Sequence, residues 1–329
     1  MGAMTPGVWI DVAEESAVSA VRRALTEEAV AVGLAERRVA ELGIVAAEIV
    51  TNLCRHAGRG TVLVRRSGPG VEVVALDSGP GMADGVPYAA DGHSTAGTLG
   101  IGLGALARLS DWTDAYSRPG GGTVYALRVG DAEPAQDAWR VAGLVRAMSG
   151  ESASGDGFAV RREGPRVTIM LCDGLGHGPL AASAANAALR AFEDAPAGAP
   201  ADLLTHVHKE ITHTRGAAIA IAALDLAAGT LHYAGLGNIA GVLVGDRQRG
   251  LVSLPGIAGH RAVAIRAYEY PLPPRPLLVM HTDGLSQRWD LADYPGLAGR
   301  DPLVIAGALL RDRGVRRDDA GVLVAKVAS

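Results

Sequence analysis

One stretch decides the fold of the second half of the chain: Asp156-Gly-Phe-Ala-Val-Arg-Arg-Glu-Gly-Pro-Arg-Val-Thr-Ile-Met-Leu-Cys-Asp173. Residues 158–162 and 167–171 read as two strands about Glu-Gly-Pro and predict a β-hairpin. Asp156 and Asp173 are symmetric about the Gly164-Pro165 tip, so antiparallel pairing sets them opposite each other. Facing carboxylates repel unless a cation lies between them, and their hard oxygens suit Mg²⁺ or Mn²⁺ rather than zinc. The hairpin predicts a metal site, although two solvated loop acids would leave the same pattern.

More aspartates stand at the ends of other predicted strands. Asp283 follows an apolar run in His-Thr-Asp-Gly-Leu, and Asp318 with Asp319 precedes the last run. Acids in these places are also common turn formers, so their position alone does not decide their role. The rest of this half shows short strands and helices, with strands expected at 217–225, 231–234, 241–244, 277–282 and 321–327 and helices near 179–192, 201–212 and 302–313.

Four strings from this half resemble the PPM-type phosphatases of the RsbX and SpoIIE kind: Ser154-Gly-Asp-Gly, Asp173-Gly-Leu-Gly-His-Gly178, Asp283-Gly and Asp318-Asp-Ala. The resemblance covers residues 139–329 and implies an α-β-β-α sandwich of two stacked antiparallel sheets flanked by helices. It also implies a metal-dependent phosphatase acting on phosphoserine or phosphothreonine. Two Mn²⁺ or Mg²⁺ ions would be bridged by Asp173 and completed by the Gly174 carbonyl, Asp156, Asp283 and Asp318.

Some positions fit this resemblance less completely. Asp318 rather than Asp319 is the expected ligand, because the family's aspartate precedes an amide or acid, an apolar residue and often a threonine. Gly321 stands here in the place of that threonine. His177 would touch the substrate, act as an acid, or only shape its glycine-rich turn, and Arg215 matches a recurrent family string without an assigned role.

The first half contains longer helical patterns. Residues 15–32 and 36–57 read as helices, the second ending at Gly58, and residues 61–66 with 71–76 read as a hairpin. Glycine-rich sequence from Gly97 to Gly104 opens a third helix, and residues 112–129 supply another hairpin. The sum is a helix layer on a mixed sheet, an α+β sandwich.

Three features of this half follow one another in a fixed order. Glu48 and Asn52 lie four apart, off the apolar stripe of their helix, where they also fit an ordinary solvated face. Asp77-Ser-Gly-Pro-Gly81 follows a strand at once, and its glycines let backbone approach a ligand. Gly97-Thr-Leu-Gly-Ile-Gly-Leu-Gly104 runs into a helix, whose free N–H groups favour phosphate.

This order resembles the GHKL family of ATP-binding domains over nearly all of residues 8–130, and within that family the RsbT-type switch kinases. The resemblance implies that Asn52 binds the Mg²⁺ of ATP, that Glu48 deprotonates the acceptor hydroxyl, and that Asp77 anchors adenine. The remaining residues assigned to the cofactor are Gly79, Gly81, Gly97, Gly100, Gly102, Gly104 and Thr123. A phosphoacceptor histidine box does not precede the domain, and His56 reads as a helix-end residue.

The bulk composition bounds the remaining possibilities. A chain of 329 residues, 48% hydrophobic, suffices for two cores, with a boundary at the polar linker 131–138. A net charge of −4 with 4% aromatics argues against nucleic acid. Apolar runs are too short for a membrane span, and a cytoplasmic location is expected. The opening Met-Gly-Ala-Met reads as an expression scar before a native start at Met4, and Cys54 and Cys172 read as buried small hydrophobes.

The function hypothesis is a partner-switching regulator that both phosphorylates and dephosphorylates serine or threonine on STAS-domain antagonist or stressosome proteins. The alternative is a phosphatase regulated by a non-catalytic ATP-binding or anti-sigma-factor-like domain. A scaffold without phosphatase activity is disfavoured because all four carboxylate positions are present. The oligomeric state is left open.

Overall fold

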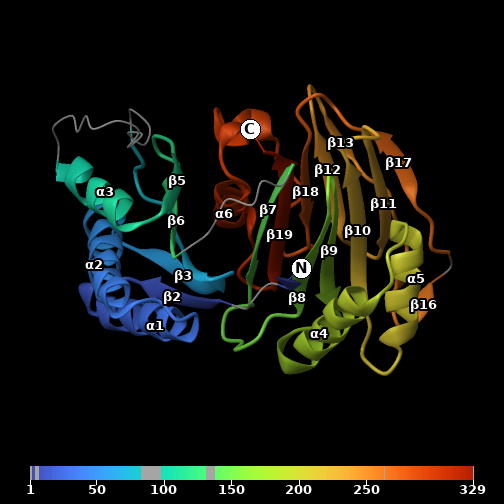
Figure 1. Ribbon diagram of the computed structural model, residues 1–329, viewed down its shortest axis with the longest axis horizontal. Coiled ribbons are helices and arrows are strands. Elements are labelled where there is room, and N and C mark those ends of the chain that lie inside the picture. Colours follow the sequence, from blue (N-terminus) through green and yellow to red (C-terminus); the bar gives the residue numbers. More distant parts are fainter. Residues whose placement is uncertain (1, 4–6, 83–97, 131–137, 263, 329) are drawn as a thin grey trace. The chain divides into compact units, whose positions relative to one another are not determined.

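A computed structural model describes residues 2–3, 7–82, 98–130, 138–262 and 264–328 (Figure 1). They belong to two compact units. The first spans Thr5–Ala135 together with Gly299–Arg311, and the second spans Met1–Met4, Gln136–Ala298 and Asp312–Ser329. The predicted linker 131–138 lies outside the described residues, apart from Ala138.

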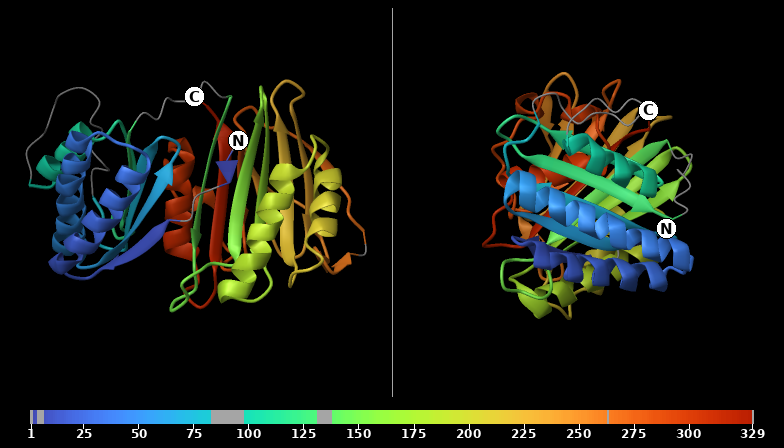
Figure 2. Two further views of the ribbon diagram at one scale, coloured as in Figure 1. Left: turned by 60° about the horizontal axis from the view of Figure 1, so that its bottom comes forward. Right: turned by 90° about the vertical axis from the view of Figure 1, so that its left-hand side faces the viewer.

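The first unit, in its described part, is built on a five-stranded antiparallel sheet in the order β2-β3-β4-β6-β5. Helices α1 and α2 pack on one face of this sheet with α3 beside them (Figures 1 and 2), and an apolar core lies between the helices and the sheet. This is the predicted α+β sandwich, but its described strands all pair antiparallel, so the expected mixed sheet was wrong. The elements are β2 (Val8–Val12), α1 (Val18–Ala31), α2 (Glu36–Asn52), β3 (Gly60–Ser67), β4 (Gly70–Asp77), α3 (Thr98–Leu109), β5 (Trp112–Ser117) and β6 (Thr123–Val129).

The helix predicted over residues 36–57 changes its winding near its end. After α2, the segment Leu53–Ala57 is a π-helix, and the chain leaves it at Gly58 with φ of 76°. The left-handed conformation suits glycine, so the predicted end is confirmed. A hydrophobic period of 3.6 residues does not reveal a π-turn, because the wider winding changes which face each later residue occupies.

Segment 299–311 joins the first unit although it lies far along the chain. The backbone N–H of Asp301 donates to Asp114 Oδ2 at 2.7 Å, and Arg300 Nη1 donates to Asp114 Oδ1 at 3.3 Å. Within the helix α6 (Pro302–Arg313), every residue from Pro302 to Leu310 is buried. A helix that is apolar all round must be covered on every side.

The second unit is a sandwich of two sheets over its described residues. The first sheet runs β1-β8-β9-β10-β11-β14 with β17 also paired to β11, and the second runs β13-β12-β18-β19-β7. Side chains from both inner faces form one core, and α4 and α5 cover the outer face of the first sheet (Figure 2). The principal elements are β7 (Trp139–Arg146), β8 (Asp156–Glu163), β9 (Arg166–Gly174), α4 (Gly178–Asp194), α5 (Pro200–Glu210), β10 (Ala217–Asp225), β11 (Thr230–Leu236), β12 (Ala240–Val244), β18 (Leu277–His281) and β19 (Ala320–Val327).

Several strands were not predicted from the sequence. Two of them, β2 and β7, are given above. The others are short: β1 (Gly2–Ala3), β13 (Gln248–Gly250), β14 (Ser253–Leu254), β15 (Gly256–Ile257), β16 (Arg261–Ala262) and β17 (Tyr268–Pro271). The shortest of them span two to four residues, too few to show an alternating pattern. None of the described helices is long and apolar enough to cross a membrane.

Candidate functional site

The hairpin of β8 and β9 brings two predicted ligands face to face. Asp156 pairs directly with Asp173 in the antiparallel register, as the symmetry of the sequence predicted. Asp156 is buried, with 6% of its surface exposed. The two carboxyl groups therefore lie at the paired ends of β8 and β9 and form the first part of the site.

Asp156 is held by groups from distant parts of the chain. Thr282 Oγ1 donates to Asp156 Oδ2 at 2.8 Å and accepts the backbone N–H of Gly321 at 2.9 Å. Asp156 Oδ1 is buried and lacks a hydrogen-bond partner among the described residues. A buried carboxylate oxygen with no donor is costly, and a bound cation would satisfy it.

The departure at Gly321 has a physical reason. A β-carbon at this position would lie 3.1 Å from Asp156 Oδ2 and 3.3 Å from Thr282 Cγ2. A side chain here would require these two groups to move by a few tenths of an ångström, and glycine leaves them in place.

Burial and like charge together raise the pKa values of these acids. Burial, and then the neighbouring Asp173, raises the pKa of Asp156 well above its ordinary value. Burial, followed by the charges of Asp283 and Asp318, raises the pKa of Asp173 to about 7. The pKa of Asp318 rises for the same reasons, burial first and Asp283 second. Such shifts are those expected of carboxylates gathered without a counter-charge.

Divalent cations fit this donor set. Its members are hard oxygen ligands of the type that Mg²⁺ and Mn²⁺ prefer. In the described residues no three carboxylate, imidazole or thiol groups already surround one point. The side chains would therefore have to draw together around an ion, as mutually repelling acids do once positive charge is supplied.

Asp319 is engaged elsewhere, which leaves the half-buried Asp318 as the more accessible member of the pair. Asp319 Oδ1 accepts the N–H of Met148 at 2.7 Å, and its Oδ2 accepts the N–H of Gly155 at 2.6 Å. Both Asp319 oxygens thus tie one loop to the start of β19. Asp318 is less buried and accepts only the N–H of Asp319 among the bonds described for it.

Asp283 has a partner that the sequence did not suggest. Asn238 Nδ2, from the turn between β11 and β12, donates to Asp283 Oδ2 at 2.6 Å. No motif marks Asn238, because the contact depends on how two distant strand ends meet. Gly174 follows Asp173 where a β-carbon would come within 2.2 Å of the Ala181 carbonyl oxygen, so a side chain is excluded there.

The Asp173 loop is flanked by two further polar side chains. Its Leu175 N–H donates to the Gly216 carbonyl at 3.0 Å, which fixes the loop beside the start of β10. Arg215 is exposed there, and its Nη1 lies 3.1 Å from where a β-carbon of Gly176 would be. His177 Nδ1 lies 2.8 Å from Glu151 Oε1.

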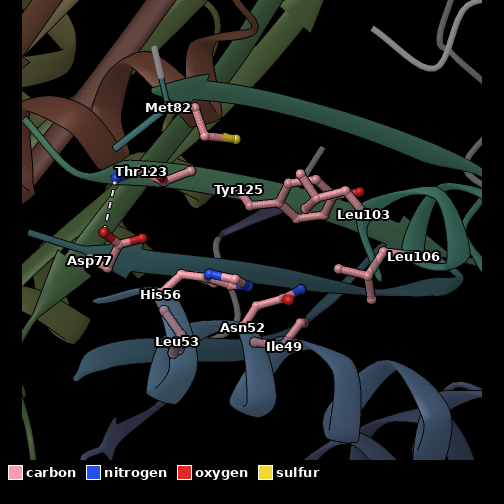
Figure 3. A pocket seen from close by; sticks show the side chains of 11 residues that line it. Ile49, Asn52, Leu53, His56, Asp77, Met82, Leu103, Leu106, Thr123 and Tyr125 are labelled. Carbon is pink, nitrogen blue, oxygen red and sulfur yellow. Dashed lines mark hydrogen bonds between the residues drawn. The ribbon is translucent and has the colours of Figure 1, made fainter. Parts of the chain in front are cut away.

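A second candidate site is a pocket of the first unit, shown in Figure 3. It encloses about 520 Å³, including its opening to solvent, and is lined by Ile49, Asn52, Leu53, His56, Ala75, Asp77, Met82, Leu103, Leu106, Thr123 and Tyr125. Most of these side chains are apolar, and a few convergent polar groups break the wall. This composition is usual for a small-molecule site.

Asp77 and Asn52 are the polar landmarks of the pocket. Asp77 Oδ1 accepts the N–H groups of Gly79 at 2.8 Å and Thr123 at 3.2 Å. Burial raises the pKa of Asp77 although these bonds oppose it. Asn52 Nδ2 is buried and lacks a hydrogen-bond partner among the residues described. An unpartnered amide is what a cavity built for a polar ligand would contain.

The structure brings some of the predicted cofactor residues together and not others. Asn52, Asp77 and Thr123 line the pocket, whereas Glu48, one turn before Asn52, is not among its lining side chains. Gly81 has a φ of 65° in the turn after β4, where a β-carbon would strike the Arg118 carbonyl oxygen. Gly97 lies outside the described residues, and Gly100, Gly102 and Gly104 lie within α3.

These three glycines lie inside the helix that the glycine-rich stretch was expected to open. Leu103 and Leu106, three residues apart, both line the pocket, so packing offsets the poor helix propensity of Gly104 between them. His56 also lines the pocket, from the π-helical turn. Sequence reasoning missed this role because it read the segment as a regular helix end.

Two family models match different parts of the chain, and the second also covers segment 299–311 of the first unit. Residues 12–128 match the histidine kinase-like ATPase domain family, and residues 163–328 match the family of stage II sporulation protein E. The serine/threonine-protein kinase RsbT of Bacillus subtilis (strain 168) is 36% identical over 80 residues, which cover 23% of this chain and 60% of RsbT. The chain thus spans less than two thirds of that relative.

Two solved structures resemble a little over half of this chain in fold. A chain from work on the bacterial stressosome, a modular system adapted to control secondary messenger signalling, is 28% identical with a TM-score of 0.53, covering 57% of this chain and 98% of its own. RsbX in complex with magnesium is 18% identical with a TM-score of 0.52, covering 58% of this chain and 96% of its own. At 18% identity the second likeness shows the fold alone.

Proposed function

This chain belongs to the stage II sporulation protein E family through residues 163–328, and from that premise we propose that it is a bifunctional regulator of a partner-switching pathway. The first domain would phosphorylate, and the second dephosphorylate, a serine or threonine of a STAS-domain or stressosome protein in the cytoplasm. The observation that carries the proposal is the presence in one chain of the Asp156–Asp173 pair and the pocket around Asp77.

The chain is an enzyme with a PPM-type phosphatase domain, preceded by a kinase-like ATPase domain. Its cofactors are a nucleotide and divalent cations. The proposal specifies ATP with Mg²⁺ for the first domain and two Mn²⁺ or Mg²⁺ for the second.

In the phosphatase domain, Asp156, Asp173, Asp283, Asp318 and the Gly174 carbonyl would hold the metal ions. When bound, the ions supply an activated water and neutralise charge on the phosphoryl group. The chain's own contribution begins with position. Thr282 and Asn238 hold Asp156 and Asp283 by hydrogen bonds, and such outer contacts orient metal ligands.

Arg215 would bind the phosphoryl oxygens of the substrate. Its exposed guanidinium stands against Gly176, three residues beyond Asp173. A planar guanidinium matches the geometry of a phosphate and keeps its charge at every physiological pH. Lysine at this position would retain the charge but not the paired donors.

In the ATPase domain, the apolar wall of the pocket would receive adenine. The Asp77 carboxylate, positioned by two backbone N–H groups, would accept the exocyclic amine of the base. The Asn52 amide would lie toward the phosphates and their Mg²⁺, and Glu48 would take the proton of the acceptor hydroxyl.

The decisive experiment is intact-mass spectrometry of a STAS-domain protein from the same genome, incubated with ATP, Mg²⁺ and the Asp173→Ala variant. The expected result is addition of one phosphoryl group, which disappears when Glu48 is also replaced by glutamine. Wild-type protein with Mn²⁺ should then remove the group. Asp246→Asn, in the exposed turn between β12 and β13, is the matched control for losing one aspartate.

One observation favours a second candidate function. Because Glu48 is not among the side chains that line the described pocket, the first domain also fits a nucleotide-binding regulator without transfer activity. ATP binding without any mass change in the tested STAS-domain proteins, together with Mn²⁺-dependent hydrolysis by the second domain, would select this candidate.

A further inference from the structure

The segment that joins α6 to β19 is held in place by its backbone. In residues 314–317, which we call the basic loop, the Val315 N–H donates to the Gly284 carbonyl at 2.8 Å. The Arg316 carbonyl accepts the N–H of Ser149 at 3.2 Å. One bond ties the basic loop to the turn after β18, and the other ties it to the loop that precedes β8. The course of this short loop is therefore fixed from both sides.

The side chains of the basic loop are open to solvent. Val315 is 42% exposed, and Arg316 and Arg317 are both exposed. Neither guanidinium has an ion-pair or hydrogen-bond partner among the residues that the structure describes. Exposed charges contribute little to the stability of a fold even when they are paired. Stability therefore does not account for two adjacent arginines at this place.

The basic loop borders two of the proposed metal ligands. Arg317 directly precedes Asp318 in the chain. Gly284, which accepts the hydrogen bond from the loop, directly follows Asp283, and a β-carbon there would overlap the Asp319 carbonyl oxygen. The turn after β18 therefore packs against the start of β19 with no side chain between them. A substrate whose phosphoryl group reaches these acids has to lie beside the basic loop.

Exposed apolar side chains also stand next to the proposed metal ligands. Among the described residues of the second unit, three of the four exposed large apolar side chains are those of Leu175, Leu180 and Val315. Leu175 lies two residues after Asp173, Leu180 lies in the first turn of α4, and Val315 belongs to the basic loop. Exposed apolar groups that collect around a polar site mark a surface for a large partner. The surroundings of the acids therefore suit a phosphorylated protein better than a small phosphate ester.

We propose that the basic loop selects the protein substrate, because Arg316 and Arg317 bind acidic side chains that flank the phosphorylated serine or threonine. This inference rests on the proposed phosphatase function and adds a class of substrate to it. A guanidinium binds a carboxylate through paired N–H donors. The chain as a whole is acidic, with a net charge of −4, so the two adjacent arginines give an acidic segment a local attraction that the net charge does not.

The test uses two phosphoserine peptides that differ only in the residues flanking the phosphoserine, which are glutamates in one and glutamines in the other. Release of inorganic phosphate is measured with the whole chain saturated with Mn²⁺. Wild type should have a kcat/KM about five- to thirtyfold higher on the glutamate peptide, mainly through KM, because two exposed ion pairs supply a factor of this size. The double variant Arg316→Gln with Arg317→Gln should lose this preference. Raising NaCl from about 0.05 M to about 0.5 M should weaken the preference of wild type, because salt screens exposed charges.

The chain offers a matched control in Arg247 and Arg275. Both are exposed, and both lie beyond the paired ends of β12 and β18 that are opposite to Asp283. The double variant Arg247→Gln with Arg275→Gln should keep the preference of wild type for the glutamate peptide.

Three results would overturn the role of the basic loop while leaving the phosphatase in place. They are a wild type without the preference, a preference that the Arg316→Gln and Arg317→Gln variant retains, and an equal loss in the control variant. Hydrolysis of 4-nitrophenyl phosphate without hydrolysis of either peptide would have the same meaning. Failure of wild type to hydrolyse 4-nitrophenyl phosphate and both peptides would overturn the proposed phosphatase function and this inference with it.

Discussion

Replacing Asp173 by asparagine should stabilise the metal-free protein while it removes metal binding. The carboxyl group of Asp173 has a pKa of about 7 in the fold, against 3.8 ordinarily. A raised acid pKa contributes stability below the ordinary value, and that stability is lost as pH rises through the folded value. The difference between these two pKa values corresponds to about 4 kcal/mol at pH 8. Asparagine keeps the shape and carries no charge.

The assay is urea unfolding in the presence of a chelator at pH 5 and pH 8. At pH 8 we expect Asp173→Asn to exceed wild type by about 2–4 kcal/mol, and at pH 5 the difference should shrink. Mn²⁺ should raise the stability of wild type at pH 8 and leave the variant unchanged, since ligands stabilise only the state that binds them. The Asp246→Asn control should match wild type in its stability at both pH values and in its response to Mn²⁺. A variant no more stable than wild type at pH 8, or a gain that does not depend on pH, would refute the reasoning.

Three further predictions concern single contacts. Thr282→Val removes the hydroxyl that donates to Asp156, so Mn²⁺ affinity measured by calorimetry should fall about 10- to 100-fold, and an unchanged affinity would contradict the role given to Thr282. Glu72→Ala removes the buried carboxylate that accepts from the guanidinium groups of Arg65 and Arg128, each at 2.7 Å. The free energy of unfolding, measured in urea, should fall by about 3–5 kcal/mol. A fall of less than about 1 kcal/mol would show that water screens these ion pairs. Asp77→Asn turns an acceptor of two N–H groups into an amide; ATP affinity, followed by fluorescence titration, should fall at least about tenfold, with an unaffected affinity counting against an adenine anchor at this position.

Local pattern was enough to predict the parts of the fold that are local. The facing of Asp156 and Asp173 follows from a hairpin tip and a period of two. The strand at 217–225 and the helix at 302–313 follow from unbroken apolar runs of the right length. In each case all the information lies within about twenty residues.

The groups that complete the sites could not be predicted, because they come from far along the chain. Thr282 is 126 residues from Asp156, and Asn238 is 45 from Asp283. Which strand ends meet is decided by sheet order, and no single segment encodes it. The position of His56 in the pocket was not predicted for a different reason. The π-helical turn that places it there leaves no mark in the amino-acid composition.

The placement of segment 299–311 has a consequence for how this gene could be divided. A fragment that ends within residues 131–138 would lack segment 299–311. Its Asp114 would then lose the Asp301 N–H and the Arg300 guanidinium that it binds in the whole chain. The complementary fragment would carry α6, buried from Pro302 to Leu310, away from the unit with which it clusters. The two halves recognised by family are therefore not interchangeable cassettes. A recombination event that swapped one of them would have to preserve a helix encoded near the far end of the other.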